Sequence, residues 1–294
     1  MQLVEHIVDG NGSGKYKIYT VDLCGPIVDE ASGGGLMRRN PAQVSARYFE
    51  VIAQRIRNDP NARGVFLRIN SPGGMATASE ALYTELDLIR QKIPIFAYAD
   101  GICASGSYMA ALGANKIFAQ PSAWIGSIGV IMQKIDVSEG LAKIGIKAET
   151  IKSAPLKDAF SQFKPMNEIE REYLEGLLAH TFERFKMLVR INRDIAGEEE
   201  VFSAKVFHAQ EAKALGLIDG IGTIYQTRAA FLHYLKERYP NIPLDRYSWV
   251  KLLPKQSRFG NLLGALEMKT NLFPEINAVS LMLANPGPWY IWMP

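Results

Sequence analysis

The chain has 294 residues, of which 48% are hydrophobic, and its 33 Lys and Arg against 30 Asp and Glu give a formal net charge of only +3. This length allows one sizeable core domain with an appendage, and the weak charge argues against a nucleic-acid-binding surface. No stretch offers the roughly 18 consecutive apolar residues of a membrane span, and residues 1–15 lack the cationic and apolar regions of a signal peptide. We therefore expect no nucleic-acid partner and, by default, a cytoplasmic location.

The chain has two cysteines, Cys24 and Cys103. Two cysteines in a chain of this length do not form a disulfide framework, and no CxxC pattern of a metal site is present. We predict that both are reduced, small and buried. No metal or nucleotide motif occurs either, so we expect no cofactor.

The first half of the chain predicts strands that alternate with helices. Residues 15–23 alternate in polarity and favour a strand, and Asn40 and Pro41 predict the start of a helix whose apolar residues recur every four positions. Further strands are predicted at residues 64–69, 93–99, 116–119 and 125–132, and helices at 76–91, from 105 and at 136–141. Such alternation is typical of an α/β fold with a mostly parallel sheet and crossover connections.

The second half predicts a strand at residues 146–151, a long amphipathic helix at 167–191, and shorter helices at 209–215 and 225–236. After residue 240 the alternation ends, and the sequence becomes aromatic and is interrupted by prolines. We therefore divide the chain into a flexible N-terminus (1–14), a core α/β domain (15–240) and a C-terminal extension (241–294).

Residues 70–74 (Asn-Ser-Pro-Gly-Gly) form the first candidate site, where a buried strand ends and a helix begins. Paired glycines allow close approach of the backbone to a ligand, and the helix start adds positive potential. This geometry suits an oxyanion hole. A simple strand-to-helix turn that needs positive φ explains the same residues.

The second candidate is Ser105, which follows a predicted strand and is flanked by Ala104 and Gly106. Small neighbours allow a nucleophile to stand at a tight turn, although the motif is not GxSxG. Alternatively, Ser105 or Ser107 only caps the helix.

A nucleophilic serine needs a base. Of the four histidines, His6, His180, His208 and His233, none lies just after Ser105, so a Ser-His triad is poorly supported. A lysine can serve if its pKa falls from about 10.4 towards 7, which disfavours its charged form by about 4 kcal/mol. Lys157 lies among small and apolar residues after the predicted strand at 146–151, but most lysines are surface residues.

Four motifs, at residues 70–74, 104–108, 126–130 and 152–157, occur in the order and at the approximate spacing found in SppA-type signal peptide peptidases, and residues 212–219 match a closing motif of that family. The chain resembles this family over roughly residues 15–230. The resemblance implies a ClpP/crotonase-like fold of repeated β-β-α units.

For the site, the resemblance implies Ser105 as nucleophile, Lys157 as general base and Ser127 as a hydrogen-bond partner of the lysine. It also implies an oxyanion hole from backbone groups near Gly73, Gly74 and Ser105.

The chain departs from the family pattern at Ala154, where glycine is usual, at Pro155, and in having no N-terminal membrane anchor in this sequence. It resembles the short, single-unit form, which assembles into homo-oligomeric rings. In such rings the serine and the lysine of one site can come from neighbouring subunits.

These observations predict a serine endopeptidase that cleaves extended apolar peptides, with remnant signal peptides suggested by the resemblance. Two alternatives share the fold: a crotonase-type acyl-CoA enzyme, which would need a carboxylate over its substrate, and a catalytically silent scaffold.

The C-terminal extension carries an apolar end, Trp289 to Met293. It is expected to be a mobile tail that docks in a peptide groove or makes a peripheral contact with a membrane surface. The simplest alternative is that it packs on the outside of the domain.

Overall fold

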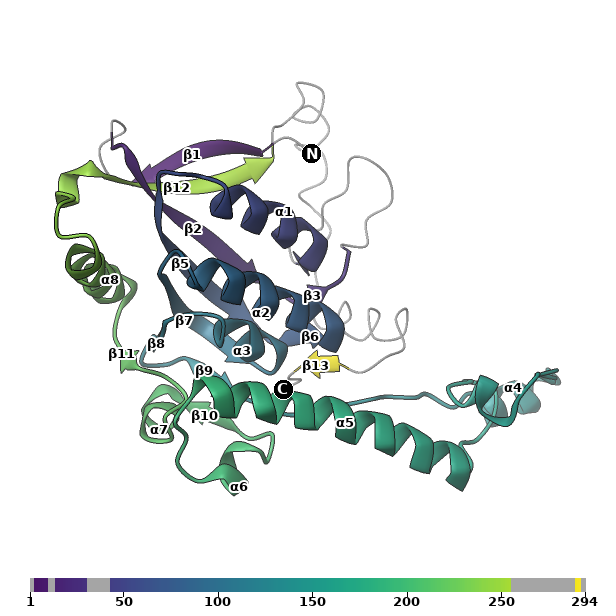
Figure 1. The fold of residues 1–294 in the computed structure, drawn as a ribbon. Coiled ribbons are helices and arrows are strands. Elements are labelled where there is room, and N and C mark those ends of the chain that lie inside the picture. The colour runs from purple at the N-terminus through teal and green to yellow at the C-terminus, as the bar shows by residue number, and fades with distance from the viewer. Residues whose placement is uncertain (1–2, 10–13, 31–42, 255–288, 292–294) are drawn as a thin grey trace.

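A nine-stranded sheet forms the centre of the computed structural model, which describes residues 3–9, 14–30, 43–254 and 289–291 (Figure 1). Its main path runs β1-β12-β2-β5-β7-β8-β11, while β9 pairs with β7, and β10 with β9. All pairs are parallel except β1 with β12 and β9 with β10. The strands are β1 (Leu3–Asp9), β2 (Tyr16–Cys24), β5 (Ala62–Ser71), β7 (Ile95–Ala104), β8 (Lys116–Ala119), β9 (Trp124–Gly126), β10 (Val206–His208), β11 (Gly220–Ile221) and β12 (Tyr247–Pro254). The α/β class with a mostly parallel sheet is confirmed.

A second, small sheet lies beyond the carboxyl ends of the main strands. Its order is β13-β6-β3-β4, and its strands are β3 (Ile27–Val28), β4 (Val44–Ser45), β6 (Gly73–Met75) and β13 (Trp289–Ile291). The succession of a long strand, a short strand and a helix occurs twice, as β2-β3-β4-α1 and as β5-β6-α2. This matches the repeated β-β-α units expected from the sequence.

Helices cover both faces of the main sheet (Figure 1). One face is covered by α1 (Ala46–Arg57), α2 (Ala76–Arg90) and α3 (Gly106–Ala111), and the other by α8 (Ile224–Arg238). Under α8, Phe231 stacks on Phe96 with ring centroids 4.6 Å apart. The remaining helices are α4 (Ser138–Lys143), α5 (Glu168–Asn192), α6 (Glu198–Val201), α7 (Ala209–Ala214) and two 3₁₀ turns, Pro155–Asp158 and Leu244–Arg246.

Most predicted elements lie within a few residues of the observed ones. The strand predicted at 125–132 is a correction, because β9 ends at Gly126 and residues 127–130 form no strand. Two further corrections concern α1 and Cys24. Helix α1 begins at Ala46, where the Ser45 side chain accepts a hydrogen bond from the Tyr48 amide; the predicted start at Asn40 and Pro41 lies outside the described residues. Cys103 is buried as predicted, whereas Cys24 is exposed, because β12 pairs with β2 only as far as Thr20 and leaves the end of β2 uncovered.

Several strands come from residues for which the sequence predicted no strand, and β1 and β12 are the longest of them. β1 lies in the segment expected to be a flexible N-terminus, and β12 lies in the C-terminal extension and inserts between β1 and β2. Their pairing joins parts of the chain more than 200 residues apart in sequence, about the farthest separation this chain allows. Local alternation of polarity carries no information about such a partner.

An arm, residues 131–166, projects beyond the N-terminal end of α5 (Figure 1). Ala159 is its one buried residue, and the predicted strand at 146–151 is absent from it. Ile146 and Ile151, expected to be in that strand, are 50% and 97% exposed. The prediction failed because an extended segment becomes a strand only beside a partner edge, and these residues pair with no described strand.

Among the residues that the structure describes, no helix is long and apolar enough to span a bilayer.

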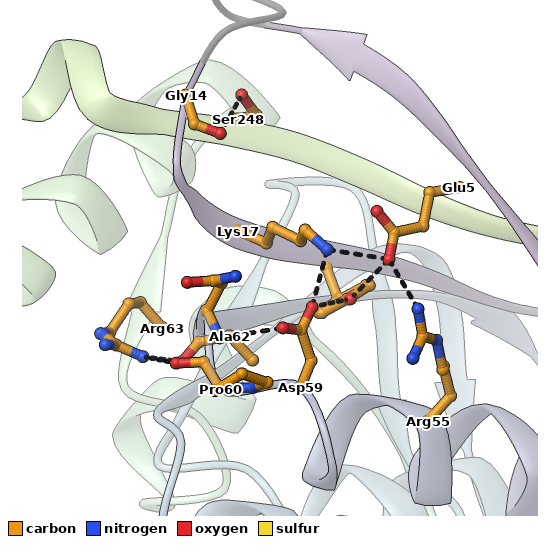
Figure 2. A network of polar contacts seen from close by, with 11 residues as sticks. Glu5, Gly14, Lys17, Arg55, Asp59, Pro60, Ala62, Arg63 and Ser248 are labelled. Atoms are coloured by element: carbon orange, nitrogen blue, oxygen red, sulfur yellow. Dashed lines mark hydrogen bonds and ion pairs between the residues drawn. The ribbon is translucent and has the colours of Figure 1, made fainter.

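A buried ion network fixes β1 and α1 to the main sheet (Figure 2). Asp59, at the end of α1, accepts hydrogen bonds from the Tyr19 hydroxyl at 2.5 Å and from Lys17 Nζ at 2.9 Å. Lys17 also lies 2.9 Å from Glu5 of β1, whose carboxylate in turn contacts Arg55. Burial alone would raise the pKa of Asp59, but the hydrogen bonds from Tyr19, Lys17 and the Asn61 amide outweigh it and hold the pKa below its usual value.

We predict that Asp59→Asn lowers the free energy of unfolding by about 2 kcal/mol, since it leaves Lys17 and Tyr19 with a neutral partner in a buried place. Because the pKa of Asp59 is lowered by folding, its contribution is present above the unfolded pKa and is lost as pH falls through the folded one. Urea unfolding at neutral pH and below pH 3 measures this difference. Glu5→Gln, at the exposed end of the network, is the control and should cost much less; equal effects of the two variants at neutral pH would contradict the prediction.

Candidate active site

Ser105 sits at the junction of β7 and α3 in a strained backbone conformation. Its φ is 56° and its ψ is −123°, in a region that residues other than glycine rarely adopt. Such a conformation costs on the order of 1–3 kcal/mol and persists only where the surroundings impose it. Ser105 is buried at 1% exposure, and its hydroxyl makes no hydrogen bond to another described residue. Ser105 therefore stands at a sharp strand-to-helix turn, the position that nucleophilic serines occupy in other α/β enzymes.

The structure brings Ser105 and Ser127 together. Ala104 pairs with Gly126 across β7 and β9, and the Ser105 amide donates to the Gly126 carbonyl at 2.7 Å. Ser127, the next residue, is also buried and also has positive φ, 48°. Its amide donates to the Lys205 carbonyl at 2.8 Å. Both serines are thus held in strained conformations by backbone hydrogen bonds to neighbouring segments.

Ser107 differs from Ser105 in that its hydroxyl is hydrogen-bonded to backbone groups and has a structural role. Its buried Oγ accepts from the Ala104 amide at 2.9 Å and lies 2.6 Å from the Ser71 carbonyl oxygen. The Ser71 hydroxyl in turn accepts from the Gly73 amide at 3.2 Å. Ser107 therefore ties the end of β5 and the start of β6 to the turn that carries Ser105.

Gly73 and Gly74, the predicted backbone donors, form β6 at the edge of this turn. Gly73 has φ 96°, and a Cβ on Gly74 would lie 2.0 Å from the Ile27 carbonyl oxygen of β3. Glycine is required at the first position for its backbone conformation and at the second for the close approach of β3. The other edge of β6 pairs antiparallel with β13, with Tyr290 opposite Gly74 and Ile291 opposite Gly73. The edge of β6 thus accepts an extended segment of chain next to Ser105.

Lys157 lies elsewhere. It is exposed in the 3₁₀ turn of the arm, and Figure 1 places α4 of the arm far from α3, which begins directly after Ser105. The Lys157 amide donates to the Ala154 carbonyl at 3.2 Å, but no hydrogen bond or ion pair joins the Lys157 side chain to a described residue. Within one chain, the structure therefore places two predicted site residues, Ser105 and Ser127, together with β6, and leaves Lys157 apart from them.

Other groups that could act as nucleophile or base are less suitable. Burial raises the pKa of the Cys103 thiol to about 12, despite a hydrogen bond with Ser107, so it remains protonated and inert. All four histidines are exposed; His208 lies at the start of α7, and its amide donates to Glu211 at 3.2 Å. This supports the interpretation of His208 as an ordinary residue at a helix start.

Two features of the site were not recognised from the sequence. One is the part played by the Gly126 carbonyl, which depends on the β7–β9 register. The other is the cross-link from Ser107 to the end of β5. The pairing of glycines at 73 and 74 was a signal for close backbone approach, but it did not identify β3 as the neighbour.

Comparison with known proteins gives a consistent result. Residues 87–235 match the sequence profile of Peptidase family S49. A candidate protease of Methanocaldococcus jannaschii is 34% identical over 213 residues, which cover 71% of this chain and 68% of the relative. A candidate signal peptide peptidase SppA of Enterococcus faecium is 31% identical over 225 residues, covering 75% of this chain and 64% of the relative. The chain thus spans about two thirds of the length of these relatives.

Among solved structures, a mutant of the 1510-N membrane-bound stomatin-specific protease aligns with 82% of this chain and 99% of its own. The TM-score is 0.44 and the sequence identity is 16%.

We predict that Gly74→Ala damages the site, because the added Cβ meets the backbone of β3 and forces β6 or β3 to move. The expected loss of unfolding free energy is about 1–3 kcal/mol. Gly176→Ala is the matched control: nothing lies within 4 Å of its added Cβ, and an alanine within helix α5 should stabilise by about 0.5–1 kcal/mol. Thermal unfolding of both variants tests this, and a Gly74→Ala variant as stable as the parent would contradict it.

Proposed function

Because this chain belongs to peptidase family S49, we propose that it is a serine endopeptidase with Ser105 as nucleophile and Lys157 as general base. The observation that carries the proposal is the strained turn at Ser105, whose hydroxyl bonds to no described residue and which lies beside a strand edge that pairs with an extended segment. A strained residue held by its surroundings at such a place suggests a catalytic role.

In the proposed reaction, neutral Lys157 takes the proton of the Ser105 hydroxyl as its oxygen attacks the peptide carbonyl. The proposed donors to the tetrahedral oxyanion are backbone N–H groups near Gly73, Gly74 and Ser105. In the free chain the Gly73 amide donates to Ser71 Oγ and the Ser105 amide to the Gly126 carbonyl, so these two amides would have to exchange partners when the oxyanion forms. Collapse breaks the peptide bond, and the leaving amine takes the proton from the lysine. In the second half of the reaction, neutral Lys157 takes a proton from water as the water oxygen attacks the ester. The Ser105 oxygen then leaves and takes the proton from the lysine, which restores the hydroxyl. Ser127 accepts or donates a hydrogen bond at the lysine and orients it.

The dyad is completed between two copies of the chain. Lys157 is exposed on the arm, and Figure 1 shows α4 of the arm far from α3, which follows Ser105; a neighbouring copy would therefore have to supply the base. The arm has apolar residues to cover: Ile144 is 70% exposed and Ile151 97%. Exposed apolar surface on this scale usually marks an interface. A homo-oligomeric ring would bury it and would give the lysine the dry surroundings that a neutral amine needs.

The substrates are extended, apolar peptides. The pairing of β13 with β6 supports this class, because a peptide added at the same edge would bind through its main chain and leave alternate side chains for selection. Remnant signal peptides have this chemistry. In the absence of such a peptide the chain's own C-terminal segment occupies the β6 edge, which favours docking in the groove over a membrane contact for this tail.

The dyad is tested with two single variants. Ser105→Ala and Lys157→Ala should each lower peptide hydrolysis at least about 10³-fold while the thermal midpoint stays unchanged, and the double variant should be no worse, because the two groups act as one unit. A fluorophosphonate should label Ser105 in the parent protein, whereas a crotonase-type enzyme or a silent scaffold would stay unlabelled. If Lys157→Ala kept its activity while Lys152→Ala lost it, the assignment of the base would be wrong.

The origin of the lysine is tested by mixing the two inactive variants. If each site combines residues from two copies, dissociated and reassembled mixtures of Ser105→Ala and Lys157→Ala should regain about a quarter of the parent activity, since that fraction of adjacent pairs carries both groups. Light scattering should give a mass well above 32.6 kDa, the mass of one chain. An inactive mixture of assembled protein would place the dyad within one copy.

The role of the tail is tested by deleting residues 274–294. We expect faster hydrolysis of a small peptide, because the β6 edge is vacated, with unchanged binding to liposomes. Unchanged hydrolysis with lower thermal stability would instead indicate that the tail only packs on the domain.

A further inference from the structure

The turn that carries Lys157 is exposed, yet it is closed by ionic contacts. Lys152 Nζ lies 2.6 Å from Asp158 Oδ1 and donates to the Pro155 carbonyl at 3.0 Å. These two contacts bring the ends of residues 152–158 together around the 3₁₀ turn. Lys157 lies within this closed segment, next to Asp158 in sequence.

A second lysine ties the same carboxylate to helix α5. Lys164 Nζ lies 3.3 Å from Asp158 Oδ1 and also contacts Glu170. The Glu170 side chain is only 1% exposed, and its other oxygen accepts from the amide of Asn167, the residue that caps α5. The contacts therefore form a continuous network, Lys152–Asp158–Lys164–Glu170, from the turn to the first turn of α5.

The two carboxylates of this network remain ionised in neutral solution. A hydrogen bond from Lys152 holds the pKa of Asp158 below its ordinary value, and Lys164 does the same for Glu170. Isolated surface ion pairs contribute little. The ion pairs of this network are not isolated, because Asp158 and Lys164 each have two partners and the last carboxylate, that of Glu170, is buried. They also act where no regular strand supports the backbone of residues 144–154.

We propose that Lys152, Asp158, Lys164 and Glu170 are positioning residues that fix the direction in which Lys157 leaves the arm. The inference rests on the proposed function, in which Lys157 is the base. The Lys157 side chain makes no hydrogen bond or ion pair to a described residue of its own chain. The backbone of the turn therefore determines which positions the Lys157 amine can reach. A displacement of about 1 Å at a reacting group can cost about 100-fold in rate.

The test uses the full-length assembled protein and the variant Asp158→Asn, which keeps the shape of the side chain and removes its charge. We expect kcat to fall about 10- to 100-fold with KM within about twofold of the parent, and fluorophosphonate labelling of Ser105 to slow by the same factor. The conservative variant Asp158→Glu, which keeps a carboxylate for both Lys152 and Lys164, should retain most of the parent kcat. The control is Glu198→Gln, which removes the exposed pair of Glu198 with Arg190 at the opposite end of α5 and should change neither constant.

The outcomes separate this inference from the proposed function. If Lys157→Ala is active, the dyad itself is wrong. If Lys157→Ala is inactive and Asp158→Asn has the parent kcat, the dyad stands and the positioning network is overturned. If Asp158→Asn does not assemble by light scattering, Lys152→Gln decides: an assembled Lys152→Gln variant with the parent kcat also overturns the inference.

Discussion

The hydrogen bond from the Ser105 amide to the Gly126 carbonyl is the contact on which the site depends. It extends the parallel pairing of β7 and β9 by one residue beyond the end of β7, just where the chain must turn into α3. The chain both keeps its pairing with β9 and turns into α3 at this residue, and it does so with a positive φ at Ser105. The strain is held because both segments are buried in a sheet covered by helices, so relaxing one residue would break pairing on either side.

The need to hold the backbone of this turn also explains why buried polar groups lie at this end of the sheet. Ser71, Ser105, Ser107 and Ser127 are all buried. A buried hydroxyl without a partner is costly, and the hydroxyls of Ser71 and Ser107 are bonded to backbone groups. The hydroxyls of Ser105 and Ser127 make no hydrogen bond to a described residue.

Much of this arrangement could be predicted from sequence, for physical reasons that apply to local elements. The strands β5 and β7 are short apolar runs, and the cap of α5 at Asn167 lies directly before a helical pattern. The positions of Ser105 and the paired glycines followed from their place at the ends of such strands. What could not be predicted depends on distant partners. β12 has an apolar run like any other, but only the edge of β2 makes it part of the sheet. The segment 146–151 has the composition of a strand and lacks an edge, so it remains irregular in a single chain. The expected setting of Lys157 after a strand depended on the same missing edge, so its exposure in a single chain and the irregular segment have one cause.

The pairing of β13 with β6 also bears on how the groove would discriminate among peptides. A segment joined covalently to its own binding edge meets that edge at an effective concentration on the order of millimolar, however dilute the protein is. A free peptide must therefore compete with the tethered β13 segment, whose effective concentration does not depend on the protein concentration. Peptides that bind the β6 edge more weakly than β13 does would be excluded by this competition. Selection among peptides would then depend on a minimum affinity for the edge rather than on the shape of a pocket.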